Sequence, residues 1–339
     1  GVGFGISAAG TRTDHQHTQD SDHEGRESQF DPVWTAVAVI DSLGWTAEMR
    51  IPFSQLRFPA ADVHEWGVQF DRWMPDKNED LSWVDIPPSE TGFISRFGTL
   101  SGIKGVRASR PVEFLPYVAA DATKRASTGV ENPLDRPYAA RVGLDAKAAL
   151  GGGLTLDATI NPDFGQVDAD PAEVNLSAFE TFFDERRPFF TEGSEMLRGN
   201  SGANYFYSRR IGAAPRIGVD GDFVDRPKSS TILGAAKLTG RLPSRLTIAG
   251  LAAITAAERA RSYDSSTAIT QSFRVEPRTA YGVFRLQQEV GTQASTIGFA
   301  TTVVQRDVKG DSTLNSRLAS EAYFGSLDWR MRFQQGKYA

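Results

Sequence analysis

The chain has 339 residues, which is enough for two ordinary domains that each bury a core. Its formal net charge of -5, without a basic stripe, excludes the electrostatic footprint of a nucleic-acid-binding protein. It contains no cysteine and no apolar run near the roughly 18 residues of a membrane helix, which excludes disulfides, thiolate metal sites and a helical membrane protein.

Residues 1–105 are predicted to form part of an antiparallel β-sandwich. Short strand-like runs recur in this part, and each is bounded by Gly, Pro or Asp, which are turn formers. The polar stretch 15–28 is expected to be a mobile loop. The expected strands lie at residues 33–40, 44–53, 66–73 and 96–103.

Residues 106–339 are predicted to form the up-and-down strands of an outer-membrane-type β-barrel. The strands approach the roughly 9–11 residues that a tilted membrane strand needs, and we expect about eight of them, joined by short turns. Their polar face carries full charges, which suits a water-filled lumen. The alternative is a half-buried antiparallel sheet outside a membrane. Apolar and polar residues alternate with a period of two at 141–150, 154–160, 231–255, 280–305 and 323–333.

A charged and aromatic segment at 161–198 interrupts these strands and is predicted to be a plug in the lumen or a lid at its rim. Its spacing is partly helical and ends at Pro188. Buried charges must be paired to be tolerated, and this segment supplies both signs. We expect an ion-pair network that locks the segment to the inner wall, formed by Asp184, Glu185, Arg186, Arg187, Arg209 and Arg210.

Two motifs resemble a bacterial family of unknown function, DUF5916. They are NPDFGQVDADPAEVNLSAFETFFDERRPFFTEGSEM at 161–196 and YFYSRRIG at 205–212. The resemblance implies a family-9-type carbohydrate-binding sandwich followed by an outer-membrane β-barrel, and the run GWTAEMRIPFSQLRF at 44–58 resembles the latter part of that sandwich. Members of this family are longer, so we expect this chain to be a partial one.

Sugar-binding sandwiches stack a pyranose on an aromatic ring and bind its hydroxyls through amides and carboxylates. Trp73 and Trp83 bracket a polar loop and are the candidate platform, whereas Trp45 and Trp66 open strands and are expected in the core. The oxygen-rich loop could also hold calcium, although its spacing matches no EF-hand. The candidate ligand-binding residues are Trp73, Asp76, Asn78, Glu79 and Trp83.

Two further groups of residues have alternative interpretations. His15, His17 and His23 lie among aspartates and could bind zinc, but a flexible surface loop is the favoured interpretation. Carboxylates in the 161–198 segment could supply a glycosidase pair, but they are dense enough there for a pair to arise by chance. We therefore assign no catalytic residue and no metal ligand. The acids concerned are Asp163, Asp168, Asp170, Glu173 and Glu180.

The sequence as a whole predicts a bacterial outer-membrane protein that binds or passes a glycan. Its expected partners are a carbohydrate and outer-membrane lipid, with no nucleic acid and no required cofactor. Two other functions stay open at this point. One is a glycan-processing hydrolase with an accessory sugar-binding domain, and the other is a structural cell-surface protein.

Overall fold

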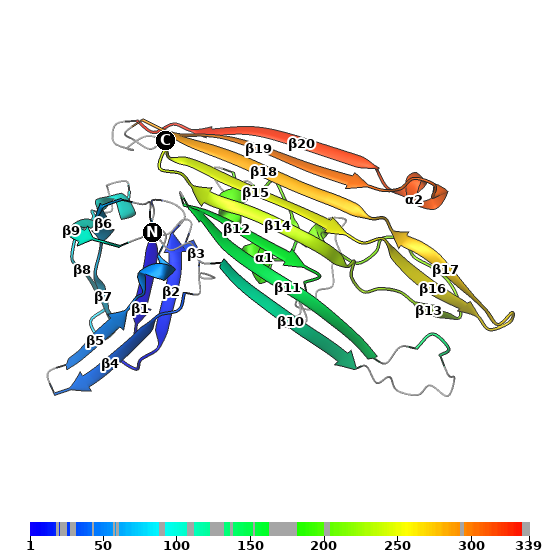
Figure 1. Cartoon of the computed structure of the whole chain (residues 1–339), viewed down its shortest axis with the longest axis horizontal. Helices are drawn as coiled ribbons and strands as arrows, with labels where there is room; N and C mark the ends of the chain where they lie inside the picture. The colour runs from blue at the N-terminus through cyan, green and yellow to red at the C-terminus, as the bar shows by residue number, and fades with distance from the viewer. Residues whose placement is uncertain are drawn as a thin grey trace.

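The computed structural model shows an all-β chain with antiparallel sheets, as predicted (Figure 1). In the described part of the chain, no helix is long and apolar enough to cross a membrane. The structure describes residues 1–17, 20, 26–27, 32–42, 44–56, 58, 61–87, 92–106, 112–122, 132–135, 138–151, 153–162, 182–199, 204–291 and 295–333.

The described part of the first 105 residues forms four small antiparallel sheets. Trp34 anchors this part: it is buried, its ring contacts Phe4, and its indole nitrogen donates to Asp14. Two short 3-10 helices, Phe53–Gln55 and Ile94–Arg96, connect strands. The sheets pair β1 (Val2–Ile6), β2 (Arg12–His17) and β3 (Arg26–Glu27), then β4 (Thr35–Asp41) with β5 (Gly44–Arg50), β6 (Val63–Val68) with β9 (Gly98–Lys104), and β7 (Asp71–Met74) with β8 (Glu79–Ser82).

Two local predictions for this part are wrong. The run 66–73 is not one strand, because the Gln69 side chain donates to the carbonyl of Val84 and accepts from its amide, which separates β6 from β7. The stretch 15–28 is not wholly a loop. Residues 12–16 pair with β1, and the strand continues to His17, which pairs with Arg26 of β3.

Residues 112–330 build one large sheet of eight strands, in the order β10-β11-β12-β14-β15-β18-β19-β20. Neighbours follow one another along the chain with two interruptions: β13 (Phe223–Asp225) lies between β12 and β14, and the hairpin of β16 (Glu258–Asp264) and β17 (Ile269–Glu276) lies between β15 and β18. These three strands form a separate sheet (Figure 1). Within the described residues the sheet is open, and β10 and β20 are its edges. Its strands are β10 (Val112–Ala122), β11 (Tyr138–Gly151), β12 (Leu154–Ile160), β14 (Ile232–Arg241), β15 (Leu246–Thr255), β18 (Thr279–Val290), β19 (Ser295–Arg306) and β20 (Glu321–Arg330).

The two faces of the large sheet have opposite character. Residues that pair directly across antiparallel strands point to the same side, and the register aligns Lys147 with Asp157 and Asp157 with Lys237 on one face. The other face carries apolar side chains open to the surroundings, with Leu327 70% and Trp329 67% exposed. The register therefore confirms the alternation expected from the sequence.

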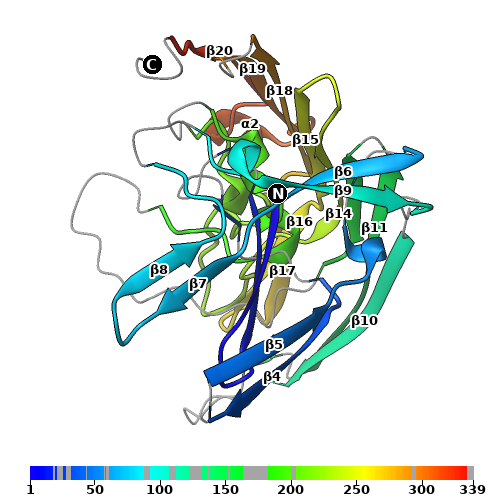
Figure 2. The same ribbon diagram turned by 90° about the vertical axis from the view of Figure 1, so that its left-hand side faces the viewer.

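A covering segment, residues 182–199 and 204–212, packs on the polar face of the sheet. Figure 2 shows the sheet following an arc, with this segment on its inner side. The segment includes α1 (Pro188–Thr191) and the 3-10 helices Ser194–Leu197 and Ser208–Arg210. Its apolar residues form one core with the middle strands, made of Phe190, Leu197, Ile211, Ile232, Ala235, Ala249, Leu251, Ala253, Tyr281 and Val283.

A second, smaller core lies where the hairpin leaves the sheet. It joins β16 (Glu258–Asp264) and β17 (Ile269–Glu276) to α2 (Ser312–Arg317), and β13 (Phe223–Asp225) pairs with β16. Asp311 caps α2 by accepting from the amide of Leu314 at 3.0 Å. This core consists of Ile217, Ala260, Val275, Val308 and Leu314.

Candidate functional site

Lys237 attaches one side of the covering segment to the sheet. Its side chain is only 1% exposed, and its ammonium donates to the carbonyls of Phe189 at 2.7 Å and Glu192 at 2.6 Å. Asp157 lies 3.7 Å away and balances the charge. Lys147 forms an ion pair with the Glu192 carboxylate. Two lysines of the wall thus bind the end of α1, and the buried ammonium of Lys237 needs the acceptors that it finds there.

Arg285 attaches the other side of the segment. It is 1% exposed and donates to both carboxylate oxygens of Asp328, at 2.6 and 2.9 Å. Tyr205 donates to the same carboxylate at 3.2 Å and lies beside the guanidinium. Gly298 faces this pair, and a Cβ there would lie 2.7 Å from the Arg285 guanidinium, so a larger residue would force the pair to shift. These contacts fix residue 205 against β18 and β20.

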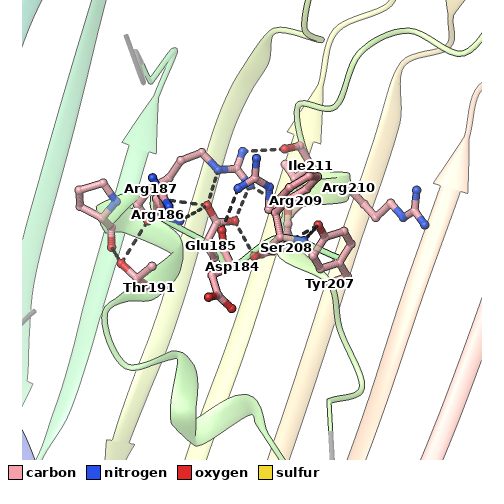
Figure 3. Close-up of polar contacts among 12 residues, drawn as sticks. Asp184, Glu185, Arg186, Arg187, Thr191, Tyr207, Ser208, Arg209, Arg210 and Ile211 are labelled. Atoms are coloured by element: carbon pink, nitrogen blue, oxygen red, sulfur yellow. Dashed lines mark hydrogen bonds and ion pairs between the residues drawn. The ribbon is translucent and has the colours of Figure 1, made fainter. Parts of the chain in front are cut away.

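Glu185 and Arg187 form the central ion pair of the segment (Figure 3). Arg187 donates to Glu185 at 2.6 and 2.7 Å, to the carbonyl of Ile211 at 2.7 Å and to that of Ser208 at 2.9 Å. The Ser208 hydroxyl donates to Glu185 at 2.6 Å, and the Arg187 guanidinium stacks on Phe190. The network therefore joins residues 185–190 to residues 208–211.

The pKa of Glu185 lies below its ordinary value. Burial by itself would raise this pKa, but the hydrogen bonds and charge of Arg187, together with the Ser208 hydroxyl, outweigh burial. The carboxylate is thus held in its ionised form. An ionised Glu185 is what keeps two distant parts of the segment together.

The other four residues of the predicted network occupy different positions. Arg209 donates to the main-chain carbonyl of Asp184 at 2.8 Å and lies over the Phe183 ring, so it binds the backbone and not the Asp184 carboxylate. Asp184 and Arg186 are exposed. Arg210 extends away from the Glu185 pair and lies over the Tyr207 ring (Figure 3). Among the printed contacts between described residues, Glu185 and Arg187 are joined through their charged side chains, whereas Arg209 reaches residue 184 through its main-chain carbonyl.

Two cavities flank the covering segment. The larger, of about 560 Å³, lies among Phe182, Glu185, Phe190 and Leu197 on the segment and Leu251 on the wall. The other, of about 450 Å³, lies between residues 205–210 and the ends of β18 and β19. Both fall within the size range of small-molecule sites.

The predicted sugar platform lies on the β7–β8 hairpin, whose turn carries Asp76 and Asn78 and whose second strand begins at Glu79. Trp73 is 55% exposed and pairs with Asp80 across the hairpin. Trp83 is 58% exposed, but its ring packs against Phe70 and fills the space beside Gly98. No ring contact joins the two tryptophans within the described residues.

The histidine and acidic candidates are only partly within the described residues. The Nε2 atoms of His15 and His17 are 3.0 Å apart on β2, whereas His23 lies outside the described residues. Asp20 accepts from the amides of Phe93 and Ser95 and from the Ser95 hydroxyl, so it ties two loops together. The described part of the chain holds no group of three metal-ligating side chains. The acids at 163, 168, 170, 173 and 180 all lie outside the described residues.

Several residues at the site could not be recognised from the sequence. Lys237 and Arg285 look like ordinary lumen charges in the sequence, and only the fold shows that both are buried. Arg216, Tyr281 and Arg306 line the smaller cavity. The period of two places Tyr281 on the polar face, but the cavity also needs the course of residues 205–216, which has no repeating pattern.

Comparison with known proteins identifies a family. The model of DUF5916, a domain of unknown function, matches residues 110–319, which is more than half of the chain and includes the large sheet from β10 to β19. This match confirms the resemblance inferred from the two motifs. No curated protein and no solved structure matches the chain.

Proposed function

Since the chain belongs to the DUF5916 family, whose function is unknown, its role must be inferred from its geometry, and we propose that it forms part of an outer-membrane β-barrel that binds a glycan or passes it across the membrane. The inverted burial of the large sheet carries this proposal. Charged residues such as Lys237 and Arg285 are buried on the covered face, whereas apolar residues such as Leu327 and Trp329 are exposed on the other. Lipid outside and water inside call for this arrangement.

The exposed apolar face extends across the whole sheet. It includes Val118 on β10, Val142 on β11, Ile160 on β12, Phe299 on β19 and Leu327 on β20. Proteins in water rarely expose contiguous apolar patches larger than a few hundred Å², because such patches drive association. Outer-membrane lipid would cover this face.

The two edge strands of the sheet also bear on the membrane proposal. Unpaired backbone groups cost several kcal/mol each in hydrocarbon, so an open edge does not persist in a bilayer. Within the described residues, β10 and β20 each have one neighbour. The proposal therefore requires further strands to pair with both edges, from the same chain or from another.

The glycan part of the proposal is supported by the β7–β8 hairpin. Trp73 and Trp83 are both more than half exposed, and the adjoining turn and the start of β8 offer carboxylates and an amide from Asp76, Asn78 and Glu79. Exposed aromatic rings next to such groups suit the apolar face and the hydroxyls of a sugar. A glycan array probed with the purified protein tests this part, and the absence of any bound saccharide would overturn it.

The membrane part is tested by placing one charge on each of two exposed apolar positions. Leu327 lies on the uncovered face of the large sheet and is 70% exposed, and Val37 lies on β4 and is 64% exposed. Each is replaced by arginine. In lipid, Leu327→Arg should cost about 2–4 kcal/mol near the midplane. In water, both changes should stay within about 0.5 kcal/mol.

Two quantities are measured: the free energy of unfolding in lipid vesicles, and the amount of each variant found in the outer-membrane and soluble fractions of the cells. We expect Leu327→Arg to lower both stability and the amount found in the outer membrane, and Val37→Arg to lower neither. Equal tolerance of the two changes, with intact protein recovered without detergent, would overturn the membrane assignment.

A further inference from the structure

The larger cavity lies between two stretches of the covering segment. Residues between 182 and 198 form one side, residues 204–208 form the other, and the space that they enclose with Leu251 measures about 560 Å³. A space of this size accommodates a ligand as large as a disaccharide. Much of its wall is aromatic, formed by Phe182, Phe183, Phe190, Tyr205, Phe206 and Tyr207.

Phe182 is the most exposed of these rings, at 67%. It meets the Tyr207 ring edge to face, with the ring centroids 5.0 Å apart. Tyr207 is itself fixed, because its hydroxyl accepts from the amide of Phe183 at 3.1 Å and donates to the carbonyl of the same residue at 3.3 Å. An exposed ring that is supported by a fixed neighbour suits the apolar face of a sugar ring.

Two polar side chains of the lining are available to a ligand. The Asp184 carboxylate is exposed, points away from the Glu185 pair (Figure 3) and has no partner among the described residues. Asn204 lies on the other stretch, where its side-chain oxygen accepts from the amide of Phe206 at 3.1 Å. This bond orients the Asn204 side chain and leaves its nitrogen to donate. A carboxylate and an amide nitrogen together serve sugar hydroxyls, which both donate and accept.

An anion is a poor fit for this cavity. Two of the three charged side chains that line it within the described residues are already paired, because Glu185 binds Arg187 and Arg198 lies 3.2 Å from Glu195. The third is the Asp184 carboxylate, which would repel a negatively charged ligand.

A cation is also a poor fit, because the protein's own arginines already occupy the rings. A guanidinium over one face of an aromatic ring weakens the attraction of that ring for a second cation. A neutral ligand with hydroxyl groups meets no such competition. Four of the lining rings have a guanidinium carbon 4.2 to 5.7 Å from their centroid, with Arg187 over Phe190, Arg209 over Phe183, Arg210 over Tyr207 and Arg285 over Tyr205.

We propose that this cavity is a second glycan site, which binds a neutral sugar unit with its ring against Phe182 and its hydroxyls on Asp184 and Asn204. The choice of a sugar rests on the proposed role in glycan binding. The choice of a neutral one rests on the cavity itself, where the described charges are paired or face away from both kinds of ion.

The test is isothermal titration of the full chain in a detergent without a sugar headgroup. The probes are three disaccharides of one linkage: a neutral hexose, a hexuronate and an amino-hexose form. All titrations are repeated with Trp73→Ala, which weakens the hairpin site, so that the remaining heat reports on the cavity. We expect the neutral probe to bind about three- to fivefold more tightly than either charged probe, the change that one unfavourable exposed charge contact produces. Equal or tighter binding of a charged probe would overturn the proposal.

Two variants and two matched controls locate the site. Phe182→Ala should weaken binding about 3- to 10-fold and Asp184→Asn about 5- to 10-fold. Phe114→Ala is the control for the first, since Phe114 is 66% exposed and lies on the uncovered face of β10. Asp121→Asn is the control for the second, since Asp121 is exposed and does not line the cavity. Both controls should change binding less than about twofold, and the unfolding midpoint of each variant shows whether the fold is intact.

The Trp73→Ala titrations separate the failure of this inference from that of the proposed function. If Trp73→Ala alone abolishes all saccharide binding, the glycan binds on the hairpin, which refutes the cavity but leaves the proposed function standing. If the unaltered chain binds none of the three disaccharides, the glycan part of the proposed function fails too. Equal effects of Phe182→Ala and Phe114→Ala would refute the cavity. Weaker binding in Phe182→Ala and Asp184→Asn but in neither control, with unchanged unfolding midpoints, would establish the cavity as the second site.

Discussion

Replacing Arg187 by alanine tests whether the covering segment is a fixed part of the fold. Arg187 is 13% exposed, and its guanidinium makes four hydrogen bonds, two to Glu185 and two to the carbonyls of Ser208 and Ile211. The change removes all four. It leaves the Glu185 carboxylate, itself 14% exposed, without its cation.

The magnitude follows from the burial of both partners. Removing one member of a buried ion pair costs about 3–5 kcal/mol, most of it from the unpaired charge that stays behind. Arg198 offers a matched control on the same segment, since it pairs with Glu195 at 3.2 Å but is 50% exposed. An exposed pair contributes at most about 1 kcal/mol, so Arg198→Ala should have a small effect.

The assay is chemical unfolding of the full chain in detergent, followed by tryptophan fluorescence. We expect a difference of about 2–4 kcal/mol between the two alanine variants. Adding Glu185→Leu to Arg187→Met should recover most of the lost stability, because replacing both members of a buried pair by apolar residues is often neutral. Equal and small effects of Arg187→Ala and Arg198→Ala would refute the network and make the segment a solvated loop.

Three other changes test separate features. Lowering the pH should destabilise the protein through Glu185. The stability that ionised Glu185 contributes is complete above the unfolded pKa of about 4.5 and is lost as the pH falls through the lower folded pKa. Glu185→Gln should therefore flatten the pH dependence of the unfolding free energy below about pH 5. Gly298→Ala should cost about 1–3 kcal/mol in unfolding free energy, since its Cβ would meet the Arg285 guanidinium at 2.7 Å, and a cost below about 0.5 kcal/mol would contradict that reasoning. Trp73→Ala should weaken glycan binding without changing the unfolding midpoint. Trp83→Ala should weaken binding and also lower the unfolding free energy by about 1 kcal/mol, because the contact with Phe70 is lost. A fall in stability for Trp73→Ala would place that ring in the core.

The strands of the large sheet could be predicted closely from the sequence. The runs 141–150 and 154–160 correspond to β11 and β12, and 231–255 splits into β14 and β15 at the expected turn. This worked because a strand with one apolar and one polar face repeats with a period of two, whichever solvent each face meets. The same property limits the inference. Alternation shows that Lys237 and Leu238 face opposite ways but not which of them is buried.

The candidate site was less accessible from the sequence because its contacts are long-range. The charged run 184–187 suggested a network, yet only the fold shows that Glu185 selects Arg187 and that Arg209 bonds to the main chain of residue 184. Lys237 binds carbonyl groups of residues 189 and 192, which carry no side-chain signal. The run 66–73 was misassigned for a similar reason, because the Gln69 contact with residue 84 is not local.

The way the covering segment is attached favours binding over passage. Wall residues hold it on both flanks, with Lys237 binding the end of α1 and Arg285 aligned with Tyr205 through Asp328. Between these flanks, Phe190 and Ile211 pack into the main core. Opening a path through the middle of the polar face would break the contacts of both buried cations, Lys237 and Arg285, and would disrupt the main core. The two cavities lie beside the segment and leave these contacts intact, so a ligand can occupy either cavity while the segment stays in place.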